Sequence, residues 1–257
     1  GYLALLVCVG ASDPRSLHLP GENLSGVYRA LPFLLAVNTG PDGLFGRTER
    51  RVVVFGGGDV ALDAARSARR LAHRGAVTVI YRKARREMSA GEEEVVGGGE
   101  EGISFLFDRS PVRIQGAESV EGVVVQQMDP GPPDASGHPT LVPRPGTEET
   151  IPCDTVIIAV GEKANIEGFP KELDFTFAAH GWPTGAREDW MTDVEGVFAG
   201  GGKSVVYGMA AGYRLAEAVD AYVAKKTGKP RTPRPDPFGG PTPPPPLSGY
   251  GGPTWTL

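Results

Sequence analysis

Three glycines and an alanine follow a run of apolar residues in the segment VVVFGGGDVA, which spans positions 52 to 61. The spacing is G-x-G-x-x-A. The first glycine permits a tight turn, the second lets the backbone approach a phosphate without a Cβ in the way, and the alanine allows close helix–strand packing. A helix that begins here would point free N–H groups and its positive dipole end at that phosphate. The pattern predicts a pyrophosphate-binding turn made of Gly56, Gly57, Gly58, Asp59, Val60 and Ala61.

Basic residues follow the next expected strand, in the run YRKARR at positions 81 to 86. NAD-binding folds usually place an acid there, which holds the ribose 2′-hydroxyl group. No acid occurs here before Glu87. We therefore expect Arg82 and Lys83 to pair with a 2′-phosphate, with Arg85 or Arg86 as a supplement, and we predict NADP(H) as the ligand. The alternative is a solvated basic loop.

These residues need a strand before the turn, a helix after it and a second strand further on. Apolar strands alternate with helical stretches along the chain, which indicates an α/β fold with a parallel sheet. Strands are expected at residues 3–9, 51–55, 77–81, 103–107, 112–114, 123–128, 155–160 and 197–199, and helices at 31–38, 59–74 and 207–225. A Pro/Gly-rich excursion is expected between residues 129 and 150.

The composition excludes several classes of protein. The chain of 257 residues is 40% hydrophobic and 22% charged, so it can bury a core. Its net charge of −5 argues against a general nucleic-acid binder. No apolar run approaches the roughly 18 to 20 residues that a membrane-spanning helix needs. We therefore expect a cytoplasmic protein without membrane insertion.

Cysteine and histidine give no sign of a metal site. The two cysteines, Cys8 and Cys153, exclude a disulfide framework and a four-cysteine cluster built from this chain alone. We expect both to be buried structural thiols. The four histidines have no ligand spacing: His18, His73, His138 and His180.

Ten of the 24 prolines lie between Pro230 and Pro253. This segment has almost no apolar periodicity and cannot bury a core. We expect an extended linker or tail. The alternative is a docking strap for a partner protein, with Phe238, Tyr250 and Trp255 as anchors.

The run VVVFGGGDVALDAARSARRLA, continued by VTVIYRKARREMSA and EEGISFLF, resembles the pyridine-nucleotide domain of the glutamate synthase small subunit family. Members of that family are FAD- and NADPH-dependent oxidoreductases. The resemblance spans roughly residues 1 to 226. The segment LLVCVGAS resembles the strand that leaves the family's FAD domain, and IPCDTVIIAVGEKAN the strand that returns to it. MTDVEGVFAGG and GKSVVYGMAAGYRLAEAVDAYV resemble its closing strand and helix.

The resemblance implies a doubly wound Rossmann-type NADP(H) domain at residues 31–155, inserted into a partial FAD-type domain made of residues 1–30 and 156–226. Residues 227–257 form the tail. The family's cysteine-rich segments and its first G-x-G-x-x-G are absent, and Gly202 stands where an Asp that binds the FAD ribityl chain is expected. The flavin contacts that remain, as the resemblance implies them, are Gly10, Gly161, Gly200, Gly201, Ser204 and Val205.

The implied activity is hydride transfer between NADPH and a flavin, in an NAD(P)H-dependent oxidoreductase subunit. Binding and orientation are the protein's part, and no catalytic side-chain acid or base is expected. A partner subunit or a missing N-terminal segment would complete the FAD site. The alternative is a non-catalytic NADP-binding or assembly subunit of a larger redox complex that has lost FAD.

Overall fold

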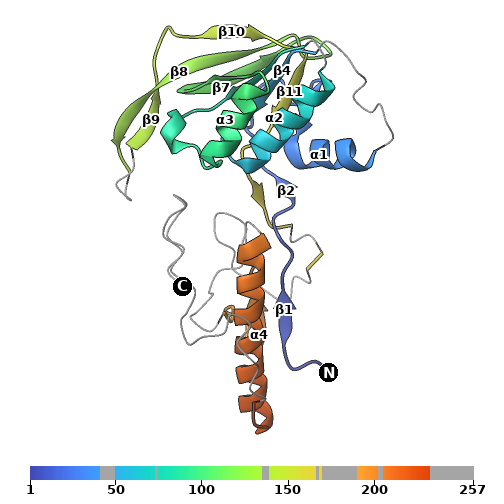
Figure 1. Cartoon of the computed structure of the whole chain (residues 1–257). Helices are drawn as coiled ribbons and strands as arrows, with labels where there is room; N and C mark the ends of the chain where they lie inside the picture. The colour runs from blue at the N-terminus through green and yellow to red at the C-terminus, as the bar shows by residue number, and fades with distance from the viewer. Residues whose placement is uncertain are drawn as a thin grey trace. The chain divides into compact units, whose positions relative to one another are not determined.

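The chain forms two compact units in a computed structural model (Figure 1), one made of Gly1–Asp13 with Glu162–Leu257, the other of Pro14–Gly161. The structure describes residues 1–40, 50–72, 75–134, 139–165, 168–169, 190–201 and 205–231. Most of the proline-rich tail therefore lies outside the described residues. The chain crosses between the units at β2 (Asp13–Pro14) and β12 (Glu162–Lys163), which form a two-stranded sheet.

A five-stranded sheet forms the centre of the unit Pro14–Gly161. Its strands are β3 (Val27–Arg29), β11 (Thr155–Ile158), β4 (Val52–Phe55), β5 (Val77–Ile80) and β6 (Ile103–Leu106), in that order. All neighbours are parallel, which confirms the predicted α/β fold with a parallel sheet. Because β3 and β11 belong to this sheet, the unit is wider than the expected domain at residues 31–155.

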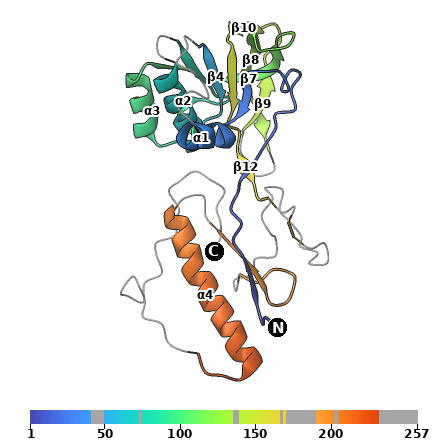
Figure 2. The same ribbon diagram turned by 90° about the vertical axis from the view of Figure 1, so that its right-hand side faces the viewer.

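Alternate side chains of the central strand β4 enter two different cores, as the period of two in a strand requires. Val52 and Val54 pack in the core beneath α1 (Ala30–Thr39), α2 (Asp59–Leu71) and α3 (Glu92–Glu100). Val53 and Phe55 pack in the other core, with residues of an antiparallel sheet. Figure 2 shows the three helices on one side of the parallel strands and the antiparallel strands on the other.

The antiparallel sheet consists of β10 (Glu149–Pro152), β8 (Gly122–Pro133) and β7 (Arg109–Gln115), with β9 (Pro139–Pro143) paired to the far end of β8. The expected Pro/Gly-rich excursion therefore contains regular structure. Prolines are tolerated here because this end of β8 pairs only with β9, so fewer backbone N–H groups are needed for pairing. The register is also irregular between Pro130 and Pro133.

Helix α2 packs tightly because its inner face is made of alanines. Ala61, Ala64 and Ala65 are fully buried there. Its outer face carries Arg66, which pairs with Glu94 on α3 and with Glu101 just after it. Hydrogen bonds to Glu101 and Glu94 raise the pKa of Arg66, and the hydrogen bond from Arg66 lowers the pKa of Glu101. These ion pairs hold α3 against the helix that follows the glycine turn.

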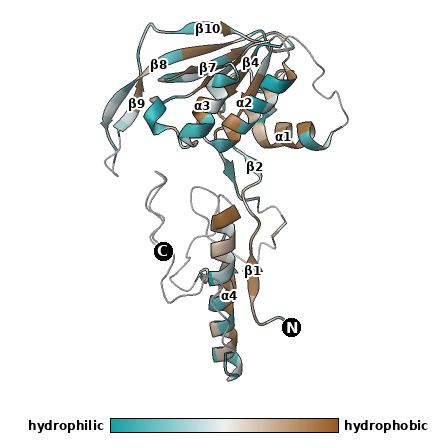
Figure 3. Ribbon diagram, viewed as in Figure 1, coloured by the Kyte–Doolittle hydropathy of each residue, from teal (hydrophilic) through white to brown (hydrophobic). Residues whose placement is uncertain are grey.

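The second unit has a small described core. β1 (Leu5–Val7) pairs in parallel with β13 (Val197–Ala199), and α4 (Val205–Thr227) follows. The ring of Phe198 on β13 meets Tyr222 on α4 edge-on, with 5.6 Å between the centroids. Apolar residues nevertheless remain exposed along β1 and α4 (Figure 3): Leu3, Leu5, Leu6, Val205, Val206, Met209 and Tyr213.

Candidate functional site

The glycine turn lies between β4 and α2, as the sequence predicts. Gly56 directly follows β4 with φ +149°, and a Cβ there would lie 2.2 Å from the carbonyl oxygen of Ala159. No other residue fits this position without moving the backbone. Gly56 also donates its N–H to the carbonyl of Ile80, at 3.1 Å, which anchors the turn to β5.

The turn opens directly into the N-terminus of α2. Gly58 is the N-cap residue and offers no side chain to the first helical N–H groups. Its carbonyl accepts the N–H of Ala61, at 2.9 Å, while the N–H groups of Asp59 and Val60 find no acceptor in the described part of the chain. These two donors and the helix dipole can bind an anion such as a pyrophosphate.

The middle glycine is covered by residues that the sequence analysis did not single out. A Cβ on Gly57 would lie 2.4 Å from the ring of Tyr81, the residue that follows β5. The carbonyl of Gly57 accepts the N–H groups of Ser89 and Ala90, each at 3.0 Å. The turn is therefore held in place by the end of β5 and by the segment after the basic run.

The four cations of the basic run differ in their partners. Lys83 pairs with Glu87 at 3.4 Å, and Arg85 pairs with Glu92 at the start of α3. Arg82 and Arg86 are exposed and form no ion pair with any carboxylate among the described residues. Of the two residues expected as the main 2′-phosphate ligands, Arg82 has an available guanidinium and Lys83 is already paired. Of the two expected supplements, Arg86 is available and Arg85 is paired.

Tyr81 and Glu87 close the loop that carries these cations. The Tyr81 hydroxyl donates to the carbonyl of Glu87 at 2.8 Å, across the 3₁₀ turn η1 (Arg85–Glu87). Burial raises the pKa of Tyr81, and the negative charge of Glu87 acts in the same direction. The tyrosine is therefore a neutral hydrogen-bond donor at neutral pH, so the loop keeps this contact.

The residues predicted for flavin are divided between the two units. Gly10 and Gly200 follow the paired strands β1 and β13, and the N–H of Gly200 donates to the carbonyl of Val7 at 3.2 Å. Gly201 is exposed beside Gly200, and Val205 is 79% exposed at the start of α4. Gly161 belongs to the other unit, where its carbonyl accepts the N–H of Arg15 at 3.0 Å. Ser204 lies outside the described residues.

A metal centre finds no support in the described ranges, where no group of three or more His, Cys, Asp or Glu side chains could hold an ion. His18 is exposed, and the other three histidines lie outside these ranges.

Of the two thiols, Cys153 is buried as expected, and burial raises its pKa to about 12. The expectation of a buried Cys8 is wrong, because β1 has a single neighbouring strand and Cys8 is exposed.

Comparison with known proteins agrees with this fold. The model of a family described as Pyridine nucleotide-disulphide oxidoreductase matches residues 1–218. The glutamate synthase [NADPH] small chain of Halomonas elongata is 38% identical over 211 residues, which are 78% of this chain and 44% of that protein. The NADP(+)-dependent formate dehydrogenase subunit beta of Moorella thermoacetica is 33% identical over 239 residues, 89% of this chain and 33% of that protein. The chain thus spans less than half the length of these relatives.

Solved structures show the same fold at low identity. Mycobacterium tuberculosis FprA in complex with NADPH superimposes with a TM-score of 0.70 and 20% identity, over 91% of this chain and 67% of that one. The thioredoxin reductase of T. acidophilum gives a TM-score of 0.62 and 19% identity, over 87% and 66%. Among the described residues, no helix is both long enough and apolar enough to cross a membrane.

Proposed function

Because the chain belongs to the pyridine nucleotide-disulphide oxidoreductase family, we propose that the unit Pro14–Gly161 binds NADP(H) at the turn between β4 and α2. The observation that carries this proposal is the pair of free N–H groups on Asp59 and Val60, which face no side chain at the glycine N-cap. A pyrophosphate accepts from such groups and is stabilised by the helix dipole. Arg82, exposed and unpaired among the described residues, supplies a cation for the 2′-phosphate.

The chemistry that we propose is hydride transfer between NADPH and a flavin, within a larger redox protein. Relatives whose names describe them as NADPH-linked redox subunits support this proposed chemistry. The bound nucleotide supplies the hydride, and this chain binds and orients it. The residues of this chain do not make a complete FAD site, since the sequence of residues 1–13 and 162–257 contains no second glycine motif like that at Gly56.

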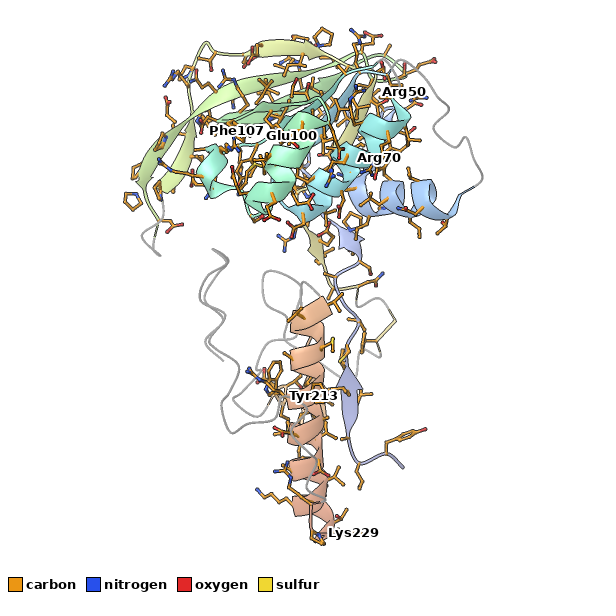
Figure 4. All side chains as sticks on the ribbon, in the orientation of Figure 1. Arg50, Arg70, Glu100, Phe107, Tyr213 and Lys229 are labelled. Atoms are coloured by element: carbon orange, nitrogen blue, oxygen red, sulfur yellow. The ribbon has the colours of Figure 1, made fainter. Side chains whose placement is uncertain are left out.

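A partner segment, from a second chain or from sequence outside these 257 residues, would complete the flavin site. The apolar residues exposed on β1 and α4 support this proposal. Leu5 and Leu6 are 42% and 45% exposed on a strand with one neighbour. Tyr213 is 46% exposed and projects from α4 (Figure 4). Exposed apolar side chains at nearby positions of a strand or a helix are typical of a protein interface.

The missing glycine turn also favours a second candidate function, a non-catalytic NADP-binding or assembly subunit that has lost FAD. The visible spectrum of the protein purified with its partner distinguishes the two. Bound oxidised flavin makes the complex yellow, whereas a colourless complex that still binds NADPH supports the second function.

Calorimetric titration of the purified chain with NADPH and with NADH tests the proposed ligand. We expect NADPH to bind at least about tenfold more tightly, because one charge-assisted contact is worth roughly 1.5–3 kcal/mol and a tenfold ratio needs about 1.4. Equal affinities would contradict the proposed 2′-phosphate contact. No binding of either nucleotide would contradict the proposed function itself.

A further inference from the structure

The basic loop contains its own counter-charge. Glu87 lies four residues after Lys83, and its carboxylate pairs with the lysine ammonium group at 3.4 Å. The lysine side chain is 29% exposed and the glutamate side chain 38%. Arg82, the residue just before this lysine, is exposed and has no such partner in the described ranges. Of these two neighbouring cations, Lys83 is therefore neutralised by a carboxylate, whereas Arg82 has no carboxylate partner among the described residues.

Glu87 also determines the shape of the loop. Its carboxylate accepts the N–H of Ala84 at 3.3 Å, and its own N–H donates to the carbonyl of Ala84 at 2.9 Å. Its carbonyl accepts the hydroxyl of Tyr81, whose ring covers Gly57. Glu87 thus fixes the loop through two contacts with Ala84 and links it to the glycine turn through one contact with Tyr81.

A carboxylate in this position conflicts with a nearby phosphate unless its charge is balanced. Charges within a few ångströms of a phosphate at a protein surface act on it strongly, with the sign of each charge deciding the direction. Lys83 balances Glu87 and leaves the pair neutral. The arginine beside the pair then meets the phosphate without competition from the carboxylate.

We propose that Glu87 is a positioning residue that shapes the loop around Arg82, and that Lys83 neutralises the Glu87 carboxylate. This inference rests on the proposed function. Lys83 does not contact the 2′-phosphate, and Arg82 is the cation that does. The sequence alone suggested that Arg82 and Lys83 act together, because both are basic and adjacent. The geometry assigns them different tasks.

A pair of substitutions tests this division. NADP⁺ and NAD⁺ differ only by the 2′-phosphate, so the ratio of their dissociation constants, measured by calorimetry, isolates that contact. Lys83→Ala leaves the Glu87 carboxylate unbalanced and should lower the preference for NADP⁺ about two- to fivefold. Adding Glu87→Gln removes that charge while keeping an acceptor for the Ala84 N–H. The double variant should return to within about twofold of the wild-type preference.

Arg82→Ala should lower the preference at least about tenfold, and Glu87→Gln should leave that variant at least fivefold below the wild type. Arg70→Ala is the control, because Arg70 is an exposed arginine in the last turn of α2, away from the loop, and pairs with Glu101 at 3.8 Å; its preference should stay within twofold of the wild type. Far-UV circular dichroism and melting temperature check that each variant is folded.

A double variant as poor as Lys83→Ala alone would show that Lys83 contacts the phosphate directly, and would overturn the inference while leaving the proposed function intact. A wild-type chain without any preference for NADP⁺ would instead overturn the proposed 2′-phosphate contact and this inference with it.

Discussion

The ring of Tyr81 lies against the α-carbon of Gly57, so closely that a Cβ on that glycine would be 2.4 Å from the tyrosine Cδ2. The contact joins the residue after β5 to the middle of the turn after β4. The two strands are neighbours in the sheet, with Phe55 beside Ile80. The turn thus takes its shape from its own glycines and from a side chain about 24 residues further along the chain.

Gly57→Ala should destabilise the unit Pro14–Gly161, because the added methyl group would displace the Tyr81 ring. Overpacking of this kind costs roughly 1–3 kcal/mol in the free energy of unfolding. Urea denaturation measures the loss. In a Tyr81→Ala background the same substitution should cost much less, since the ring is gone. An equal loss in both backgrounds would mean that the ring is not the cause.

Gly58→Val should abolish NADPH binding and leave the chain folded. A Cβ at Gly58 would meet only the hydroxyl of Ser89, at 3.2 Å, which can rotate away. The remaining methyl groups would occupy the space in front of the helix N-terminus, where the pyrophosphate is expected. Calorimetry measures the binding, and the melting temperature reports the fold.

Gly99→Val serves as the control for this substitution. Gly99 is exposed on α3, and a Cβ there would have open space around it. The control should bind NADPH as the wild type does. Normal binding by the Gly58→Val variant would mean that this turn is not the nucleotide site.

Glu22→Gln should make the protein less stable at neutral pH and less sensitive to acid. Burial acts to raise the pKa of Glu22, but hydrogen bonds from the Ser16 hydroxyl, the Leu19 N–H and Arg29 outweigh it, so the pKa lies below its ordinary value. A lowered pKa in the folded state stabilises the fold above the unfolded-state pKa of about 4.3, and this contribution is lost as the pH falls through the folded-state value. We expect a loss of about 1–3 kcal/mol at pH 7.

The difference between wild type and variant should shrink when urea denaturation is repeated below about pH 4. Glu100→Gln is the control, because Glu100, labelled on Figure 4, is exposed and forms no ion pair in the described part of the chain. It should match the wild type at both pH values. A Glu22→Gln variant whose deficit stayed constant with pH would exclude Glu22 as the group that titrates.

The isolated chain should bind FAD weakly or not at all. A Rossmann-type flavin site draws much of its affinity from a glycine turn at a helix N-terminus. Outside the turn at Gly56, the one G-x-G-x-x-G of the sequence is Gly97–Gly102, which begins inside helix α3 rather than at a helix N-terminus. Gly202 stands where the resemblance implies an Asp. Each lost hydrogen bond to a charged group costs roughly 1.5–3 kcal/mol, so two or more lower the affinity by a factor on the order of 10² to 10⁴. Submicromolar binding in calorimetry would disprove this.

The turn and its flanking elements could be predicted from sequence because each depends on local signals. The run at Val52–Phe55 is continuously apolar, as buried parallel strands are, and the glycines after it mark its end. The structure places the strand at Val52–Phe55 and starts the next helix at Asp59, the predicted residue. The predicted and observed bounds agree closely because no residue in this segment favours a different secondary structure.

Helix α3 was not predicted, because three of its nine residues are glycines, which disfavour helices. Tertiary packing explains its formation. Gly98 is buried, and a Cβ there would lie 3.4–3.5 Å from side chains of Phe105, Ile103 and Leu62. The close approach of α3 to β6 and α2 therefore uses a small residue, and this burial outweighs the low helix propensity.

The different ion-pair partners of the loop cations could not be predicted, since they depend on how the loop folds back. Lys83 and Glu87 are four residues apart, which would have suggested a pair only if a helical turn had been expected there. Arg85 finds Glu92 on an element that the sequence analysis missed. Position in a basic run therefore does not reveal which cation remains available.

The most direct measurement is an amide ¹H–¹⁵N NMR titration of the chain with NADP⁺. The account predicts saturable shifts for the amides of Gly57, Asp59 and Val60, which surround the proposed pyrophosphate position, and for Arg82 beside the 2′-phosphate. The same titration with NAD⁺ should shift the turn amides at higher concentration and affect Arg82 much less. Saturable binding that leaves the amides of Gly57, Asp59 and Val60 unmoved would contradict the account.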